Sequence, residues 1–382
     1  MKTTERDPMA ATSNPGTTHE AVQRVLDGAV SSGATPGIVT EAWKGDSRWF
    51  ASAGKADIST GRERAPQELF RIGSAAKAFT AATTLKLVGE GVLSLDDTVE
   101  KWLPGLLDGS QYDGDKITLR QLLNQTSGVS NFSMDPEFFA GGQGDAWYER
   151  RFKVFTPEEL VRIALRHPPD NAPGEAFRYS NTQYYLAAMM VEKATGESYG
   201  DVLDRLILRP LDLTRTSLPT TQTVIPGPHP VHYSRLYAED PAAPLHDATE
   251  SNETTAWSAG GMISSTGDLL TFFAALFSGR ILKPAQMEEM VTTVSTDGSG
   301  WLPNTRYGLG VWVEQKLQSG VPVWGNGGAD YGTFTLVMGS RDGTHLVAGH
   351  VNTDFSPQAY AAFLAILDIE FGSEFGSDEY TG

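Results

Sequence analysis

The sequence predicts an α/β protein in which strands from both ends of the chain form an antiparallel sheet and a mainly helical segment is inserted between them. Three observations predict this architecture. Strand-like stretches separated by turn residues occur near the N-terminus, at 37–43 and 48–53. Helical periodicity and long loops dominate from about residue 95 to residue 250. Residues 307–352 alternate with a period of two between Gly and Asp turns, as in an antiparallel meander.

The expected organisation of the 382 residues has three parts. Residues 1–18 are rich in Thr, Ser, Ala and Pro and lack an apolar stretch, so we expect a disordered leader without a secretory signal. We expect 19–95 and 255–382 to form one discontinuous α/β domain. The remaining segment, 96–254, is expected to be the mainly helical inserted domain.

The helices are predicted from apolar spacing and from their boundaries. Between residues 19 and 33, Val22, Val25, Leu26 and Val30 follow helical spacing. The segment 75–90 is rich in Ala and Leu and ends at a glycine, which predicts a helix there. Further helices are expected at 119–124, 157–166, 182–195, 199–207, 266–278 and 357–371.

The strands are predicted from alternation and from turn residues. Lys44-Gly45-Asp46 joins the two N-terminal stretches as a hairpin. The C-terminal strands are expected at 307–314, 321–325, 333–338 and 345–352.

Composition excludes several classes of function. The chain has 30 basic and 47 acidic residues, a net charge of −17, so its surface repels nucleic acids and anionic membranes. It has no cysteine, which excludes disulfides, Cys-ligated zinc, iron–sulfur clusters and a thiol nucleophile. No window approaches the roughly 18 consecutive apolar residues that span a bilayer. We therefore expect a cytoplasmic location.

Ser74 and Lys77 form the first candidate pair, in a segment that reads Ser-Ala-Ala-Lys at the start of a predicted helix. Residues three apart share a helix face, so the hydroxyl and the amine can touch. A helix N-terminus lowers the pKa of a nearby amine, and a neutral lysine can act as the base for a serine. A second copy, Ser52 to Lys55, follows a strand and contains a glycine, so we interpret it as a turn.

Two later clusters bear on the same chemistry. Tyr179 and Asn181 bracket a turn before a helix, and a phenol and an amide can project from there into one cleft. Alternatively, the tyrosine packs its ring and the asparagine caps a helix that begins at Thr182. Residues 324–329 read Trp-Gly-Asn-Gly-Gly-Ala at the end of a strand. They allow close approach of a ligand to the backbone, or else form a tight hairpin turn.

These pieces, in this order, resemble the serine β-lactamase and penicillin-binding-protein superfamily, whose signature is S-x-x-K, S-D-N and K-T-G. The middle motif here is Tyr-Ser-Asn, as in class C β-lactamases and D-Ala-D-Ala carboxypeptidases. The segments 117–132, 179–196, 258–279 and 307–312 also look like the carboxypeptidase branch. The resemblance covers residues 20 to 370 and implies a β-lactamase/transpeptidase-like fold, an antiparallel sheet flanked by helices with an inserted all-helical domain.

The resemblance also implies a role for each matching residue. Ser74 is the nucleophile that is acylated, and Lys77 is its base. Tyr179 passes a proton to the leaving group, with its phenolate stabilised by Lys77, and Asn181 orients the substrate. The N–H groups of Ser74 and Ala329 form the oxyanion hole, which contributes about 3 kcal/mol per donor.

The third motif departs from the family pattern. Asn326, Gly327 and Gly328 occupy the place of Lys or His, then Thr or Ser, then Gly. Trp312 stands where related carboxypeptidases carry a basic residue. We expect these four residues to line the substrate site, and a free carboxylate would lack its usual partners there. The departure favours an uncharged ester or amide as substrate.

The predicted function is serine acyl transfer through an acyl-Ser74 intermediate, by a transacylase or an esterase/amidase of specialised metabolism such as antibiotic biosynthesis. The alternatives are a D-Ala-D-Ala carboxypeptidase or β-lactamase and, in another class, a catalytically inactive member that binds a ligand. We expect no cofactor and no metal ion. The expected partners are a small-molecule or short-peptide ester or amide and, for transfer, an amine, with no nucleic acid and no membrane; the sequence carries no signal for an oligomeric state.

Overall fold

A nine-stranded antiparallel sheet organises the computed structural model, which describes residues 15–372 except 239, 241 and 316. The strand order is β3-β2-β1-β13-β12-β11-β10-β9-β8, so strands from the two ends of the chain meet in the middle of the sheet. β1 pairs with β13 from Ile38 opposite Val351 to Lys44 opposite His345. This pairing joins the two terminal parts of the chain, as the sequence predicts.

The strands of the main sheet are β1 Gly37–Lys44, β2 Ser47–Asp57, β3 Arg62–Glu63, β8 Val294–Ser295, β9 Thr305–Tyr307, β10 Trp312–Glu314, β11 Val323–Asp330, β12 Thr333–Gly339 and β13 His345–Val351. Two small sheets pair β4 Phe70–Arg71 with β7 Ile263–Ser264, and β5 Tyr233–Ser234 with β6 His246–Asp247.

The α-helices are α1 Pro15–Ser31, α2 Ala76–Gly89, α3 Val99–Trp102, α4 Leu119–Leu123, α5 Pro136–Ala140, α6 Gly144–Arg150, α7 Pro157–Ala164, α8 Asn181–Thr195, α9 Tyr199–Leu203, α10 Trp257–Gly260, α11 Thr266–Phe277, α12 Pro284–Val291 and α13 Pro357–Phe371. Shorter 3₁₀ turns lie at Gly73–Ala75, Phe132–Met134 and Glu253–Thr255, and a π turn, Asp204–Leu208, continues α9.

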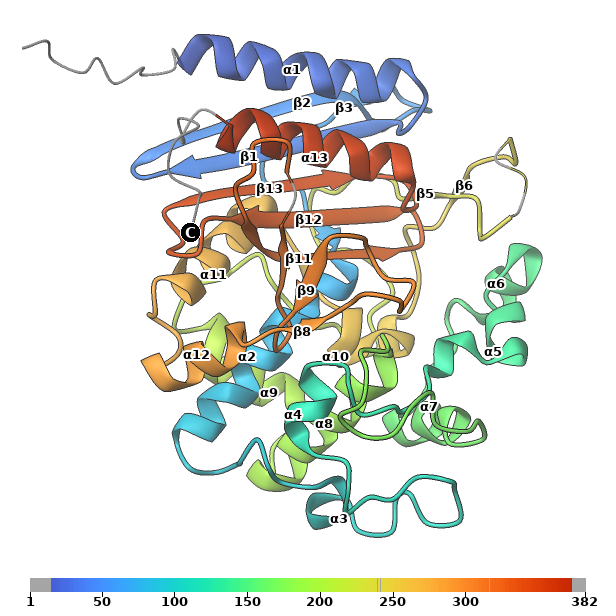
Figure 1. Cartoon of the computed structure of the whole chain (residues 1–382). Helices are drawn as coiled ribbons and strands as arrows, with labels where there is room; N and C mark the ends of the chain where they lie inside the picture. The colour runs from blue at the N-terminus through green and yellow to red at the C-terminus, as the bar shows by residue number, and fades with distance from the viewer. Residues whose placement is uncertain (1–14, 239, 241, 316, 373–382) are drawn as a thin grey trace, which may run out of the picture.

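Helices cover both faces of the sheet (Figure 1). α1 and α13 pack side by side on one face, whereas α2 and α11 pack on the other. Successive side chains of a strand point to opposite faces of the sheet, so each strand contributes apolar side chains to a core on both faces. Met338 and Val347 belong to the cluster under α1 and α13, while their neighbours Val337 and Ala348 belong to the larger cluster on the α2 side.

The helical body sits against the α2 side of the sheet (Figure 1). Its central helix, α8, has ten consecutive buried residues, from Thr182 to Val191. Capping boxes at Thr118 and Thr156 begin α4 and α7, which satisfies backbone N–H groups that have no partner within the helix. The division into two domains stays a prediction.

Three details correct the sequence predictions. α1 begins at Pro15, inside the segment expected to be a disordered leader. Proline suits a first helical turn, because the N–H that it lacks would have no partner there. The rest of that leader, 1–14, lies outside the described residues. The strand expected at 307–314 divides into β9 and β10, because Gly310 adopts φ +72° in the turn between them. β11 continues to Asp330, five residues beyond its expected end. Among the described residues, no helix has the length and apolar character needed to cross a bilayer.

Candidate active site

Ser74 lies in the 3₁₀ turn Gly73–Ala75 that leads directly into α2, and Lys77 lies one turn further on. The Lys77 Nζ is 3.0 Å from the Ser74 Oγ. The contact predicted from their spacing is therefore present. The second copy of the pattern behaves differently. Ser52 and Lys55 lie within β2, not in the predicted turn, and Lys55 pairs with Glu63 at 3.3 Å.

Lys77 is fully buried, with an exposed fraction of 0%. Burial lowers the pKa of its amine well below the usual 10.5. Two acceptors surround the Nζ besides Ser74: the Asn181 Oδ1 at 2.8 Å and the Ala259 carbonyl oxygen at 2.7 Å. A neutral amine has two N–H donors and one lone pair. If the donors serve these two oxygens, the lone pair remains for the Ser74 hydroxyl proton, which is the arrangement a base requires.

Tyr179 precedes α8 and also contacts Ser74. Its hydroxyl donates a hydrogen bond to the Ser74 Oγ at 2.5 Å. Its ring stacks on Trp301, with centroids 4.4 Å apart, so part of its packing is independent of the hydroxyl. Burial raises the pKa of the phenol well above 10, and the nearby Tyr307 raises it further. Both shifts favour the neutral forms of Lys77 and Tyr179 before reaction. The stabilisation of a Tyr179 phenolate by Lys77 stays a prediction, and the Lys77 Nζ lies 4.8 Å from the centre of the Tyr179 ring.

Asn181 is the first residue of α8, and the N-cap is Ser180. The alternative in which Asn181 caps the helix is therefore wrong. Its Oδ1 accepts from Lys77, while its Nδ2 lies 3.5 Å from the Ser133 Oγ. The amide thus connects the buried amine to the wall of the cavity described below.

Ala329 and Ser74 lie together because two glycines allow their backbones to touch. A Cβ placed on Gly328 would lie 2.2 Å from the Ser74 nitrogen, and one on Gly73 would lie 2.7 Å from the Ala329 nitrogen. The pairing of β10 with β11 ends at Gly325, so the edge of β11 beyond it faces the start of α2. The hairpin alternative for this segment is wrong, since it lies within β11. This arrangement brings together the two N–H groups of the predicted oxyanion hole.

The other predicted substrate-binding residues lie away from the cavity. Trp312 is 2% exposed and packs in the cluster under α1 and α13, because alternation along β10 turns it to that face of the sheet. Asn326 is buried, and its Nδ2 donates to the Gly310 carbonyl oxygen at 2.7 Å. Its Oδ1 accepts from the N–H of Gly327. Asn326 and Gly327 thus hold the β9–β10 turn against α2, and the expectation that these residues and Trp312 line the site is corrected.

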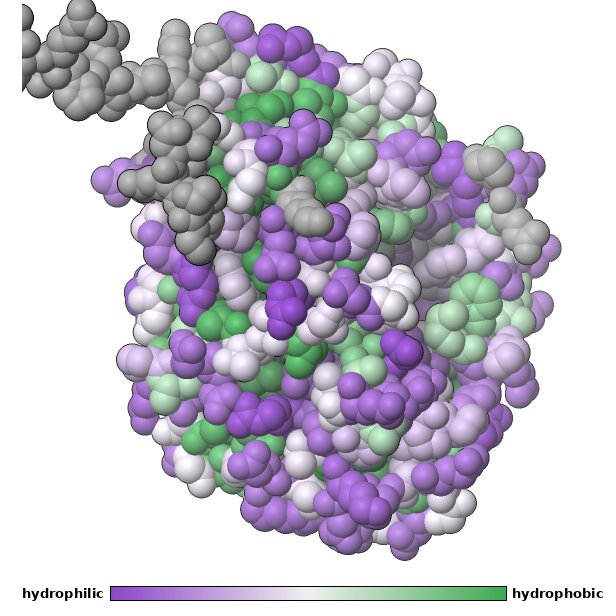
Figure 2. Space-filling view, viewed as in Figure 1, coloured by the Kyte–Doolittle hydropathy of each residue, from purple (hydrophilic) through white to green (hydrophobic). Residues whose placement is uncertain are grey.

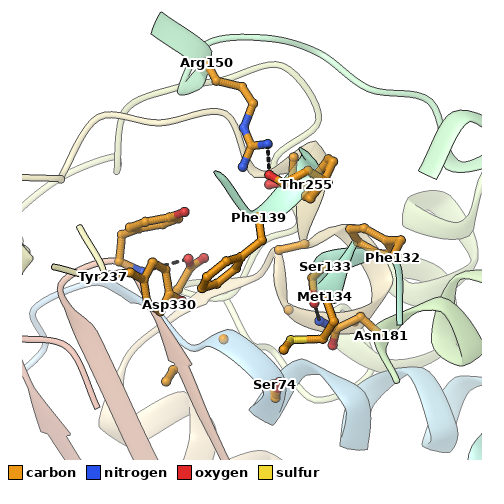
Figure 3. Close-up of a pocket in the computed structure, with 17 residues that line it drawn as sticks. Ser74, Phe132, Ser133, Met134, Phe139, Arg150, Asn181, Tyr237, Thr255 and Asp330 are labelled. Carbon is orange, nitrogen blue, oxygen red and sulfur yellow. Dashed lines mark hydrogen bonds between the residues drawn. The ribbon is translucent and has the colours of Figure 1, made fainter. Parts of the chain in front are cut away.

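A cavity of about 260 Å³ opens above Ser74 (Figure 3). Ser74, Asn181 and Ala329 line it, as predicted for the site, together with residues of the helical body and of the β11–β12 hairpin. Much of the remaining wall is apolar or aromatic: Phe132, Met134, Phe138, Phe139, Tyr237 and Tyr331. Figure 2 shows the mixture of hydrophilic and hydrophobic residues over one whole face of the molecule.

Comparison with known proteins agrees with this geometry. A model of the beta-lactamase family matches residues 22–369. The chain belongs to the beta-lactamase family. The D-stereospecific amidohydrolase of a Streptomyces species is 41% identical, with a TM-score of 0.85 over 92% of this chain and 98% of that one. The D-amino acid amidase of Ochrobactrum anthropi SV3, solved with L-phenylalanine amide, is 26% identical, with a TM-score of 0.79 and the same coverage.

Penicillin-binding protein 4* of Bacillus subtilis is another relative of this beta-lactamase family member. It is 29% identical over 291 residues, or 73% of this chain. The chain spans only 60% of that relative's length. Together the family match and the solved relatives identify the chain as a serine hydrolase or acyltransferase with the β-lactamase/transpeptidase-like fold.

Sequence reasoning missed several residues that line the cavity of this family member. Met134 and Tyr237 are 67% and 52% exposed at its rim, although both side chains are large and apolar in character. Arg150 reaches the wall from α6, and Asp330 reaches it from the end of β11. Asp330 was open to prediction, because it directly follows Ala329. The other three come from segments whose approach to Ser74 depends on tertiary folding.

Within 15–372, leaving out the three gaps, no three His, Asp or Glu side chains gather closely enough to hold a metal ion.

Proposed function

We propose that this chain is a D-stereospecific amidohydrolase that acylates Ser74 with an amino acid amide or ester and passes the acyl group to water or to an amine. The contact network of Ser74 with Lys77 and Tyr179 carries the proposal. The aromatic cavity supports an apolar acyl group, and the preference for D-amino acids is inferred from the solved relatives.

The reaction follows from the positions of the donors and acceptors. Ser74 Oγ attacks the carbonyl carbon while Lys77 Nζ takes its proton. The carbonyl oxygen becomes an oxyanion between the N–H groups of Ser74 and Ala329. The leaving nitrogen receives a proton from the Tyr179 hydroxyl, and the proton held on Lys77 then restores that hydroxyl. The C–N bond breaks, and the acyl-Ser74 ester remains with an amine released.

The second half of the reaction reverses these proton transfers. Water or an amine attacks the ester carbonyl, the same base takes its proton, and Ser74 leaves with its proton restored. Hydrolysis and aminolysis thus use the same groups and differ in which nucleophile reaches the cavity. A role in specialised metabolism and a cytoplasmic location stay predictions.

The test is intact-mass spectrometry of the protein mixed with D- or L-phenylalanine amide, or with the corresponding methyl esters. We expect a transient mass increase equal to one phenylalanyl group for the D compounds, and release of free phenylalanine. Addition of an amine should divert part of the product to a new amide. Ser74→Ala should show neither adduct nor product. Equal rates for both enantiomers would contradict the stereospecific part of the proposal.

The main alternative is a D-Ala-D-Ala carboxypeptidase or a β-lactamase. Both classes of substrate carry a carboxylate next to the reacting group. Among the described residues that line the cavity, Arg150 is the basic one, and its guanidinium already donates to the Phe138 carbonyl oxygen. Competition between phenylalanine amide and a D-alanyl-D-alanine peptide discriminates the two. An inactive member would lack the intact contacts of Ser74 and would give no adduct with any substrate.

A further inference from the structure

Asp330 ends β11 and immediately follows Ala329, the residue beside Ser74. Its side chain lines the cavity, on the other side from Met134 and Asn181 (Figure 3). Ser74, Ala329 and Asp330 line the same cavity, so a small substrate whose carbonyl is held at Ser74 and Ala329 lies in the cavity that Asp330 lines.

The charged groups behind Asp330 are already matched. Arg71 and Glu253 form a buried ion pair at 2.5 Å, and the Arg71 guanidinium also donates to the carbonyl oxygens of Thr249 and Ser251. Asp330 accepts a hydrogen bond from the Tyr331 N–H at 2.8 Å. In the part of the chain that the structure describes, no basic nitrogen lies within ion-pair distance of the Asp330 carboxylate.

The ionised form of the Asp330 carboxyl group is unfavourable when no cation lies in the cavity. Burial and the neighbouring Glu253 raise the pKa of Asp330 well above its usual value, while Arg71 opposes that shift only in part. A cation placed beside Asp330 would favour the ionised form and offset part of the cost. The site therefore has a carboxyl group in position whose ionised form needs a cationic partner, and that partner would have to come with the substrate.

We propose that Asp330 binds the α-ammonium group of the substrate, so that the site selects amides and esters of α-amino acids with a free amino group. This inference rests on the proposed function. The carbonyl would be held at Ser74 and Ala329, the ammonium at Asp330, and the side chain against the aromatic rim formed by Phe139 and Tyr237. Three different contacts on one carbon distinguish its two enantiomers.

The test compares three p-nitroanilides of the same size class: D-phenylalanyl, N-acetyl-D-phenylalanyl and 3-phenylpropionyl, which lacks the nitrogen. The unaltered protein should favour the free amine over 3-phenylpropionyl by on the order of 10- to 100-fold in kcat/KM, the range for a charge-assisted hydrogen bond. Asp330→Asn should remove this preference and change turnover of the 3-phenylpropionyl compound less than threefold. Glu149→Gln removes an exposed carboxylate from α6 and should leave the preference intact.

A measurement on the unaltered protein tests the proposal even if the Asp330→Asn variant does not fold. 2-Phenylethylammonium should inhibit hydrolysis of a neutral ester at least tenfold more strongly than 3-phenylpropanol does. Equal inhibition by the two compounds, equal turnover of the three anilides, or an equal loss on all three in Asp330→Asn would overturn the assignment of Asp330. In each case Ser74 would still be acylated, so the proposed function would stand. Absence of any Ser74 adduct would instead refute the proposed function.

Discussion

Gly328 lies against the backbone of Ser74 so closely that a Cβ on Gly328 would come within 2.2 Å of the Ser74 nitrogen. The same Cβ would meet the Ile72 carbonyl oxygen at 2.2 Å. No flexible side chain is available to yield, because both contacts are backbone atoms. The close approach brings the backbone nitrogens of Ser74 and Ala329 near each other, so the packing of a strand on a helix start forms the site proposed as the oxyanion hole.

This contact predicts that Gly328→Ala separates β11 from the start of α2. We expect a stability loss of about 1–3 kcal/mol, as for overpacking in a core. Turnover should slow by about a hundredfold or more, as when an oxyanion donor is displaced. Thermal unfolding and ester hydrolysis measure the two effects. Gly267→Ala is the control, because its Cβ would meet only the Glu41 carboxylate at 3.9 Å. Full activity in Gly328→Ala would show that the close approach is dispensable.

Ser74→Ala should abolish turnover while the fold survives, because the hydroxyl is a small part of a well-packed turn. Lys77→Ala should lower the rate by about 10³-fold or more, as removal of an activating base does. Ser52→Ala, in the second copy of the motif, should be neutral, since Ser52 lies in β2 and its hydroxyl makes a long hydrogen bond of 3.4 Å to the Arg64 carbonyl oxygen. Rates with a p-nitrophenyl ester and circular dichroism of each variant provide the measurement.

Tyr179→Phe keeps the ring that stacks on Trp301 and removes the hydroxyl that donates to Ser74. We expect a loss of about 10²- to 10⁴-fold in rate with little change in Tm. The effect should be larger for an amide than for a p-nitrophenyl ester, whose leaving group needs no proton. A large drop in Tm with a modest effect on rate would favour a role in packing alone.

The acid limb of the pH profile, the decrease in kcat/KM at low pH, should report the pKa of Lys77. Its pKa is lowered by burial, and only the neutral amine accepts the Ser74 proton. Thus kcat/KM should fall as the pH decreases through this pKa, which lies well below 10.5. Asn181→Asp places a carboxylate 2.8 Å from the Nζ, favours the protonated amine and should move the limb to higher pH. Gln222→Glu, an exposed added charge, should leave the limb in place.

The substrate charge should matter on the leaving-group side. We expect an amino acid amide or ester to exceed the matched peptide with a free C-terminal carboxylate by at least tenfold in kcat/KM, or about 1.4 kcal/mol. The reason is that Asn326 and Gly327 provide neither the cation nor the hydroxyl of related sites. Direct competition between the two substrates measures the ratio. Arg150→Gln should leave this ratio of kcat/KM values unchanged. A larger ratio in the variant would show that Arg150 binds the carboxylate of the peptide.

Local sequence patterns determined a large part of this protein. The spacing of Ser74 and Lys77 on a helix start, and the alternation in β12 and β13, depend on residues near one another in the chain. Such short-range patterns determine which face of an element is apolar and which side chains can touch along it. The order of the motifs was sufficient to indicate the family, which the match over residues 22–369 confirms.

Only the tertiary structure decided which residues form the cavity. Trp312 and Asn326 occupy strand positions next to the site, yet side-chain alternation and one hydrogen bond to Gly310 remove them from it. Met134 and Arg150 approach Ser74 from segments more than 50 residues away in the chain, and no local pattern encodes that approach. The sequence predicted a lowered pKa for Lys77 from its place at a helix start, whereas the tertiary structure adds complete burial, which lowers this pKa because it removes the amine from water.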